Sequence, residues 1–380
     1  MFTSLPIPAY LYNPLHTYLA VGLCFMTALY FIHASGNSVL YARSKTSIVL
    51  SVTYGLFLII LLGLRPVFAM KYFGDSSTYA AHYETILNTN FQDEESDWLW
   101  LYLMYYCRYI GLGTSDFFLL VTFLYIGGQV LCCYVLMRNN PWLAVLLCFA
   151  SFSFFSYGVN GLRNGLACSF VLVGLSLIGG SNKVGKILAV LCLMTATFFH
   201  KSTTLPVLAC LLACFLIRKP KTALWFWLVS IPISLTAGSM VESVFLDLGF
   251  DDRLTYYLAG QDDEEMMNQF SDTGFRWDFL LYSAAPVLLI WYATVKRSFD
   301  DRSYNIIAVT YLISNAFWIM IIRAAFSSRF AYLSWFVYPI VLAYPLLRFN
   351  MWEKQNRKAA YILMAYALFT LIMFLKGREL

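Results

Sequence analysis

The stretch "VNGLRNGLACSF", residues 159–170, places one arginine and two asparagines between two strongly apolar runs. The guanidinium of Arg163 is permanently charged, and its planar fork of N–H groups matches phosphate and carboxylate oxygens. Glycines flank it on both sides, and glycine allows a ligand to approach the backbone closely. The stretch therefore predicts an anion-binding position at Arg163, with Asn160 beside it.

Other cations lie at the ends of apolar runs, among them Arg65, Arg329 and Lys201. Arg163 and Arg329 each stand just before an apolar helix, where the positive end of the helix dipole disfavours a cation unless an anion is near. Helix N-termini themselves bind anions. Together these positions predict a pocket for an anionic substrate. The competing interpretation is that each arginine snorkels to lipid headgroups or pairs with a loop carboxylate.

Two residues could remove a proton from a substrate hydroxyl. His200, in "FFHKSTTLP", stands beside Lys201, and Asp75, in "FGDSSTY", stands apart from the acidic clusters. Carboxylates and histidines are the usual general bases. A lone histidine can equally be a hydrogen-bonded structural residue, so both interpretations of His200 stay open.

Motifs for other chemistries are missing from the sequence. There is no Asp-x-Asp, no phosphate-binding glycine loop and no Gly-x-Ser-x-Gly elbow. The other three histidines cannot complete a zinc triad, and the nine cysteines lie mostly inside apolar runs without metal or disulfide spacing. We therefore expect no metal site and no cofactor.

The composition places these residues in a membrane protein. The 380 residues are 60% hydrophobic and only 12% charged, whereas soluble domains carry about 25% charged residues. The net charge of +5 is scattered among loops, which excludes a nucleic-acid-binding surface. Apolar runs of membrane-spanning length predict an all-α polytopic fold of about twelve helices. These spans are 15–34, 47–65, 115–137, 142–158, 164–180, 187–200, 203–217, 223–237, 277–295, 304–322, 330–347 and 359–375.

Loop charges predict the orientation. If the N-terminus lies outside, the alternate loops contain fifteen of the 26 Lys and Arg residues, against three acidic residues. The positive-inside rule makes that side cytoplasmic. The basic residues are Arg43, Lys45, Arg138, Lys183, Lys186, Arg218, Lys219, Lys221, Lys296, Arg297, Arg302, Arg348, Lys354, Arg357 and Lys358.

Two long segments, 66–114 and 238–276, fall on the outer face. The first ends in "DWLWLYLMYYCRYIGLG", an aromatic amphipathic stretch better suited to lying at the interface than to crossing. Neither a linker nor an internal repeat divides the chain. The prediction is one integral membrane domain over residues 1–380.

In order along the chain, Arg65, "GDSSTY", "NGLRNGLA", "FHKS" and "RFAY" resemble the motifs of EpsG-like polymerases of the broader Wzy class. "GDSSTY" resembles the family's Gly-x-Asp-x-x-x-Tyr motif, with Gly74 directly before Asp75, and "NGLRNGLA" resembles its Asn-x-x-Arg-x-x-x-Ala motif. The resemblance covers short islands between residue 65 and about 332. The resemblance implies that Arg65, Asp75, Arg163, His200 and Arg329 are site residues. Asn164 stands where the family has glutamine.

The resemblance also implies an activity and a place in the cell. Such enzymes polymerise repeat units of O-antigen (in lipopolysaccharide), capsule or exopolysaccharide, linked to undecaprenyl pyrophosphate, at the outer face of the bacterial inner membrane. They are glycosyltransferases in chemistry. Arg163 and Arg329 would then bind pyrophosphate, with Arg65, Lys201 and Asn160 nearby. A chain-length regulator and a flippase are the implied protein partners. The alternatives are a transporter or flippase for lipid-linked glycan, and an O-antigen ligase.

Overall fold

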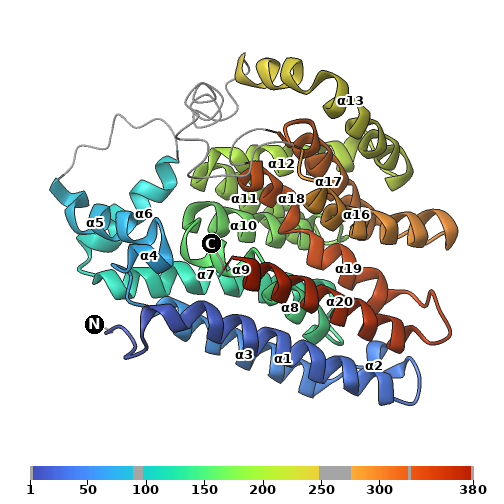
Figure 1. The fold of residues 1–380 in the computed structure, drawn as a ribbon, viewed down its shortest axis with the longest axis horizontal. Helices are drawn as coiled ribbons and strands as arrows, with labels where there is room; N and C mark the ends of the chain where they lie inside the picture. The colour runs from blue at the N-terminus through green and yellow to red at the C-terminus, as the bar shows by residue number, and fades with distance from the viewer. Residues whose placement is uncertain (1–2, 89–96, 248–274, 324–326, 378–380) are drawn as a thin grey trace. The chain divides into compact units, whose positions relative to one another are not determined.

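The structure is a computed structural model that describes residues 3–88, 97–247, 275–323 and 327–377 (Figure 1). These residues form helices and no strand, which confirms the all-α prediction. Six of the described helices are long and apolar enough to cross a membrane, and shorter apolar helices accompany them. The chain is therefore a polytopic membrane protein, while the number twelve stays a prediction.

The six candidate spans agree with predicted ones to within a few residues at most ends. They are Ala9–His33 (η1 and α1), Lys45–Gly63 (α3), Thr114–Leu136 (α7), Trp277–Lys296 (α16 and η5), Arg329–Arg348 (within α18 and α19) and Gln355–Lys376 (α20). The prediction of a continuous span over 142–158 is wrong. That segment forms α8 (Trp142–Phe149) and α9 (Phe154–Val159), separated by a short break.

Hydrogen bonds explain why the break between α8 and α9 is tolerated. The Phe154 amide donates to the Ser151 carbonyl at 3.0 Å, and the hydroxyls of Ser151 and Ser153 pair with each other at 3.0 Å. Thr370, on α20, donates to the carbonyl of Ala150 at 2.6 Å. A non-helical backbone is stable at membrane depth only when its polar groups find partners in this way.

The chain packs as two compact units. The first contains residues 1–200 and 343–380, and the second contains residues 201–342. Besides the elements already given, the first unit contains α2 (Ser38–Tyr41), α4 (Met70–Phe73), α5 (Ser76–Thr85), η2 (Ile86–Asn88), α6 (Trp98–Tyr109), α10 (Leu162–Ile178) and α11 (Lys183–Phe199). The second contains η3 (Lys201–Thr203), α12 (Thr204–Phe215), α13 (Pro220–Asp247), α16 (Trp277–Trp291), η5 (Tyr292–Lys296), α17 (Arg302–Met320), α18 (Ser327–Trp335) and the first part of α19 (Tyr338–Arg348).

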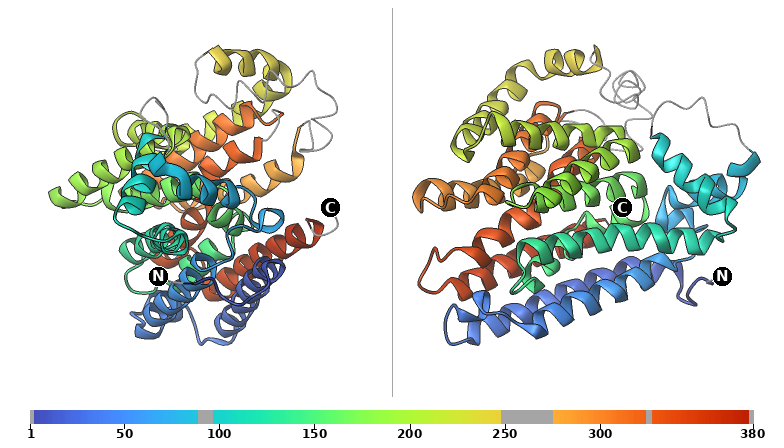
Figure 2. Two further views of the ribbon diagram at one scale, coloured as in Figure 1. Left: turned by 90° about the vertical axis from the view of Figure 1, so that its left-hand side faces the viewer. Right: turned by 180° about the vertical axis from the view of Figure 1, so that it is seen from behind.

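The long helices of the first unit pack in pairs: α1 against α20, α3 against α7, α7 against α10, and α10 against α11. Figures 1 and 2 show α1, α3 and α7 running along a common direction. Small residues bring the helices together, as is usual in membranes. A Cβ on Gly63 would lie 3.0 Å from the backbone of Leu119, so α3 and α7 touch at that point.

Loops of the first unit gather at its two ends. At one end, Ser44 donates its amide to the Asn139 carbonyl at 2.9 Å, and the Asn37 side chain donates to the Trp352 carbonyl at 3.0 Å. These contacts join three predicted inner loops, which contain Arg43, Arg138 and Lys354 among their basic residues. α3 begins at this end, directly after Ser44, and Arg65 follows its opposite end.

The second unit has a polar centre in its apolar core. Asn315, on α17, accepts a hydrogen bond from the Trp227 indole at 2.7 Å and donates to the hydroxyls of Ser283 and Ser334 at 3.2 and 2.9 Å. The Trp335 indole donates to Ser283 at 2.8 Å. This network ties α13, α16, α17 and α18 together.

The predicted outer segments differ in how far the structure describes them. In the described part of 66–114, the helices that precede α7 have at most 12 residues and none is a candidate span, as expected for an interfacial segment. Within 238–276, α13 continues to Asp247 past a kink at Ala237. Residues 248–274 lie outside the described residues.

Candidate functional site

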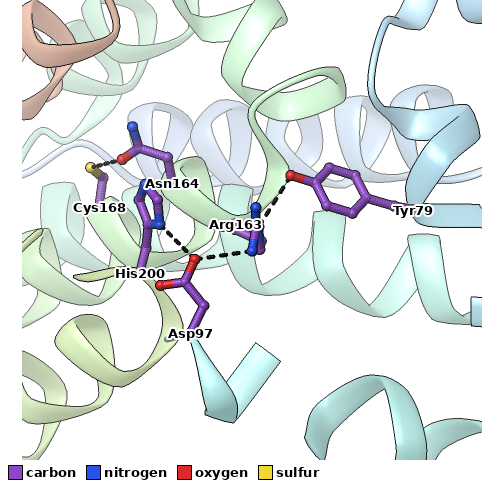
Figure 3. A network of polar contacts seen from close by, with 6 residues as sticks. All are labelled: Tyr79, Asp97, Arg163, Asn164, Cys168 and His200. Atoms are coloured by element: carbon purple, nitrogen blue, oxygen red, sulfur yellow. Dashed lines mark hydrogen bonds and ion pairs between the residues drawn. The ribbon is translucent and has the colours of Figure 1, made fainter. Parts of the chain in front are cut away.

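Arg163 and His200 meet at one carboxylate, that of Asp97 (Figure 3). Arg163 Nη1 lies 3.0 Å from Asp97 Oδ2, and His200 Nδ1 lies 3.0 Å from the same oxygen. The Asp97 side chain is 8% exposed and that of Arg163 is 19% exposed. We call Asp97, Arg163 and His200 the charged cluster.

Three helix ends position the charged cluster. Arg163 lies in the first turn of α10, His200 follows the last residue of α11 in an extended conformation, and Asp97 precedes α6. Asp97 has φ 56° and ψ 30°, a left-handed conformation that aspartate and asparagine adopt more readily than most residues. Its carboxylate offsets the unfavourable interaction of Arg163 with the positive end of the α10 dipole.

Tyr79, on α5, holds the other side of the Arg163 guanidinium. Arg163 Nε donates to Tyr79 Oη at 3.2 Å, and the guanidinium carbon lies 5.5 Å from the centre of the tyrosine ring. The ring itself packs edge-on against the buried Trp100 of α6 at 5.4 Å. Two elements therefore fix the orientation of Arg163, and its Nη2 group is left for an anion.

Asp75 and Asn160 form a second contact at this end of the unit. Asn160 Oδ1 accepts the backbone N–H of Asp75 at 2.8 Å, and the Asp75 side chain is exposed. Gly74 makes the approach possible, because it has φ 52° and an added Cβ would fall 2.4 Å from Asn160 Oδ1. Asn160 thus positions the backbone that carries Asp75, and the Asp75 carboxylate acts electrostatically on Arg163.

Arg65 is enclosed, with only 1% of its surface exposed. It donates to the Leu62 carbonyl at 2.6 Å, the Ser76 hydroxyl at 2.7 Å and the Val159 carbonyl at 3.4 Å. Arginine keeps its charge in proteins, so these acceptors solvate a buried cation. Arg65 therefore binds α3, α5 and α9 to one another.

The remaining predicted residues are placed as follows. Lys201 is exposed in η3 and directly follows His200 in the chain, while Arg329 is half-buried in α18. Both belong to the second unit. Their participation with Arg163 in one pocket stays a prediction. Asn164 accepts a hydrogen bond from Cys168, one turn later on α10, at 3.2 Å.

Sequence reasoning missed Asp97 as a candidate and did not single out Tyr79. Asp97 ends the acidic run "DEESD" and directly precedes the amphipathic helix α6. This position was the sequence feature that could have identified Asp97 as a candidate. Tyr79 is the tyrosine of "GDSSTY", the island that also contains Asp75. Acidic loop runs are usually solvated, so the run gave no reason to expect a buried carboxylate at Asp97.

The charged cluster combines two chemical capacities. A fixed guanidinium beside a helix N-terminus can stabilise charge on phosphate oxygens. An imidazole held by a carboxylate can accept a proton. Among the described residues, no group of three or more His, Cys, Asp or Glu side chains could hold a metal ion.

Comparison with known proteins identifies the family. Searches of curated proteins and of solved structures found no match. The family model described as the EpsG family matches residues 48–379, which include all the residues of the charged cluster. Because this match covers most of the sequence, the chain belongs to the EpsG family and is a membrane protein of polysaccharide biosynthesis.

Proposed function

We propose that the protein is a polymerase that joins oligosaccharide repeat units linked to undecaprenyl pyrophosphate. It would do so by glycosyl transfer at the outer face of the bacterial inner membrane. The observation that carries the proposal is the charged cluster, in which Asp97 joins Arg163 and His200 in a member of the EpsG family.

Arg163 serves the leaving group. When the bond between the anomeric carbon and the pyrophosphate oxygen breaks, the lipid pyrophosphate takes the electron pair and gains negative charge. Two contacts already fix the guanidinium, through Nε to Tyr79 and through Nη1 to Asp97. Its Nη2 N–H groups bind the phosphate oxygens without reorganisation, which is how preorganised donors lower a barrier.

His200 serves the acceptor. Asp97 accepts the N–H of His200 Nδ1, so Nε2 carries the lone pair. Nε2 takes the proton of the acceptor hydroxyl as that oxygen forms its bond to the anomeric carbon. Asp75 is the alternative base, since its exposed carboxylate lies at the N-terminus of α5. Turnover of His200→Gln and of Asp75→Asn separates the two assignments. The substitution that removes the general base should cause the larger loss.

Arg65 and Asn160 are positioning residues in this proposal. Arg65 joins the elements around "GDSSTY" and "NGLR", and Asn160 holds the Asp75 backbone. Arg329 and Lys201 remain proposed contacts to pyrophosphate. The proposed orientation rests on the positive-inside rule. The end with the basic loops is cytoplasmic, and the charged cluster faces the outer side.

Cysteine labelling tests the orientation. All nine native cysteines lie in described segments and none is exposed. A single new cysteine at Lys71, which is exposed on α4 four residues before Asp75, should react in intact spheroplasts with a membrane-impermeant maleimide. A cysteine at Asn139, in a basic loop, should react only after lysis. The reverse pattern would overturn the orientation.

Reconstitution tests the function. Purified protein in nanodiscs, given the lipid-pyrophosphate-linked repeat unit, should produce a ladder of polymers. Transbilayer movement of that lipid in liposomes without a ladder would indicate a flippase. Transfer only to a separate lipid acceptor would indicate a ligase. Either result would contradict the polymerase proposal.

A further inference from the structure

An exposed row of aromatic side chains runs along α6. Trp98, Tyr102, Tyr106 and Tyr109 are 40%, 38%, 58% and 69% exposed. The rings of Trp98 and Tyr102 lie 5.9 Å apart edge to face, and those of Tyr102 and Tyr106 are stacked at 6.1 Å. We call these four residues the aromatic row.

The aromatic row begins at the charged cluster. Trp98 directly follows Asp97, and its ring packs at 5.0 Å against Phe198, two residues before His200. The opposite face of α6 is buried through Trp100, Met104 and Cys107 among others. This buried face fixes the rotation of α6, so the aromatic row is held outward and leads away from the cluster.

The exposed surface of α6 differs from the surfaces that suit lipid chains. The exposed large side chains of α3 are Val49, Leu50, Val52, Leu56, Phe57 and Ile60, nearly all aliphatic. On α6 the exposed positions up to Tyr109 hold only indole and phenol rings. The 12 residues of α6 extend about 18 Å, which is too short to cross a membrane.

We propose that the aromatic row binds the sugar rings of the oligosaccharide and leads the glycan to and from the charged cluster. This inference rests on the proposed polymerase function. The apolar C–H face of a sugar ring packs flat on an aromatic ring, and the tyrosine hydroxyls meet the sugar hydroxyls at the rim. Tyrosine and tryptophan provide such surfaces at little cost in conformational entropy.

The spacing of the row fits a chain of rings. Residues four apart on a helix are displaced by about 6 Å along its axis. That rise is comparable with the length of one sugar residue. Tyr102 and Tyr106, whose rings are nearly parallel, therefore offer successive platforms to successive sugars. The rival explanation, an aromatic belt that anchors the protein at lipid headgroups, predicts no preference for glycan.

The test uses the full-length protein in nanodiscs and a lipid-free glycan fragment of two to four repeat units. The variant that removes two platforms is Tyr102→Ala with Tyr106→Ala, and the variant that keeps the rings is Tyr102→Phe with Tyr106→Phe. Tyr30→Ala is the control, because Tyr30 is 63% exposed on α1 of the same unit, far along the chain from the cluster. Fragment affinity and polymer length are measured for each.

We expect the double alanine variant to bind the fragment about tenfold more weakly and to give shorter polymer. The double phenylalanine variant should lose much less, and Tyr30→Ala should match the wild type. Unchanged fragment affinity and polymer length in the double alanine variant would overturn the inference, as would an equal loss in Tyr30→Ala. If the double alanine variant does not fold, Tyr106→Ala alone is measured by the same criteria. A wild type that binds the fragment but makes no polymer would refute the polymerase, not the glycan-binding row.

Discussion

Asp97→Asn is the substitution that examines the charged cluster most directly. Asparagine has nearly the same size as aspartate and tolerates the left-handed backbone at this position. It therefore keeps the geometry at the start of α6 and removes only the charge. The variant removes the negative charge beside the Arg163 guanidinium and the anionic acceptor of the His200 Nδ1 proton.

The size of the effect follows from these two contacts. A hydrogen bond to a charged group contributes about 1.5–3 kcal/mol. If that stabilisation is lost in the transition state because Arg163 is no longer held, the rate falls by about 10- to 150-fold. The asparagine amide can also donate to His200 Nδ1, which places the imidazole proton on Nε2, or it can leave both tautomers populated. In either case less of the His200 imidazole has the free Nε2 lone pair that accepts the proton. General bases contribute about 100-fold or more, so we expect turnover to fall by at least about 100-fold.

Turnover in nanodiscs, normalised to inserted protein, is the measurement. Asp116→Asn is the matched control, because Asp116 lies in the first turn of α7 and its carboxylate accepts the Gly113 amide at 3.1 Å, a role that asparagine can keep. Normal turnover of Asp97→Asn, or a loss no larger than that of Asp116→Asn, would refute the assigned role of the cluster. A loss explained fully by reduced insertion would make Asp97 a folding residue.

Three further predictions concern the same end of the first unit. Arg163→Lys should lose about 100-fold in rate at normal membrane levels, because one ammonium cannot keep both the Tyr79 and Asp97 contacts; wild-type polymer ladders from this variant would contradict the prediction. Gly74→Ala should lower stability by roughly 1–3 kcal/mol, measured by thermal unfolding in detergent. Gly22→Ala, inside α1 and with nothing within 4 Å of its added Cβ, should not lower it, because alanine favours a helix more than glycine does. Polymerisation should continue in EDTA, as the missing Asp-x-Asp motif indicates, and complete loss restored by magnesium or manganese would show that arginines alone do not stabilise the leaving group.

The structure and the family resemblance predict different roles for Arg65. The resemblance implies that it binds pyrophosphate, whereas the structure shows it buried between three helices. Its three bonds, to two backbone carbonyls and Ser76, predict that Arg65→Ala is destabilised by at least about 2 kcal/mol and accumulates poorly. Protein that remains folded should keep its affinity for the lipid-linked repeat. Normal stability combined with lost affinity would return Arg65 to the pyrophosphate site.

The sequence by itself determined the class of the protein and most of its long helices. A bilayer accepts only segments that satisfy their own backbone and expose apolar side chains, so runs such as 47–65 and 359–375 leave little choice of structure. Charge bias predicted which loops share a side, and the contacts of Asn37 and Ser44 place three of those loops together in the first unit. Arg163 and His200 were also recognisable from residue type and position.

Only the tertiary structure decided which of these residues act together. Asp97 lies 66 residues before Arg163, in an acidic run whose other members gave no reason to expect burial, and its side chain is fixed by the packing of α6 against α11. Arg65 and Arg163 look alike in sequence, as arginines beside apolar helices. Their difference arises because the Ser76 hydroxyl and the Val159 carbonyl, from later segments, help to enclose Arg65. Arg163, in contrast, stays partly exposed between Asp97 and Tyr79. Hydropathy indicates only whether each segment prefers lipid. The partners of a buried polar group come from elsewhere in the chain, as Thr370 shows when it donates to the Ala150 carbonyl at the break between α8 and α9.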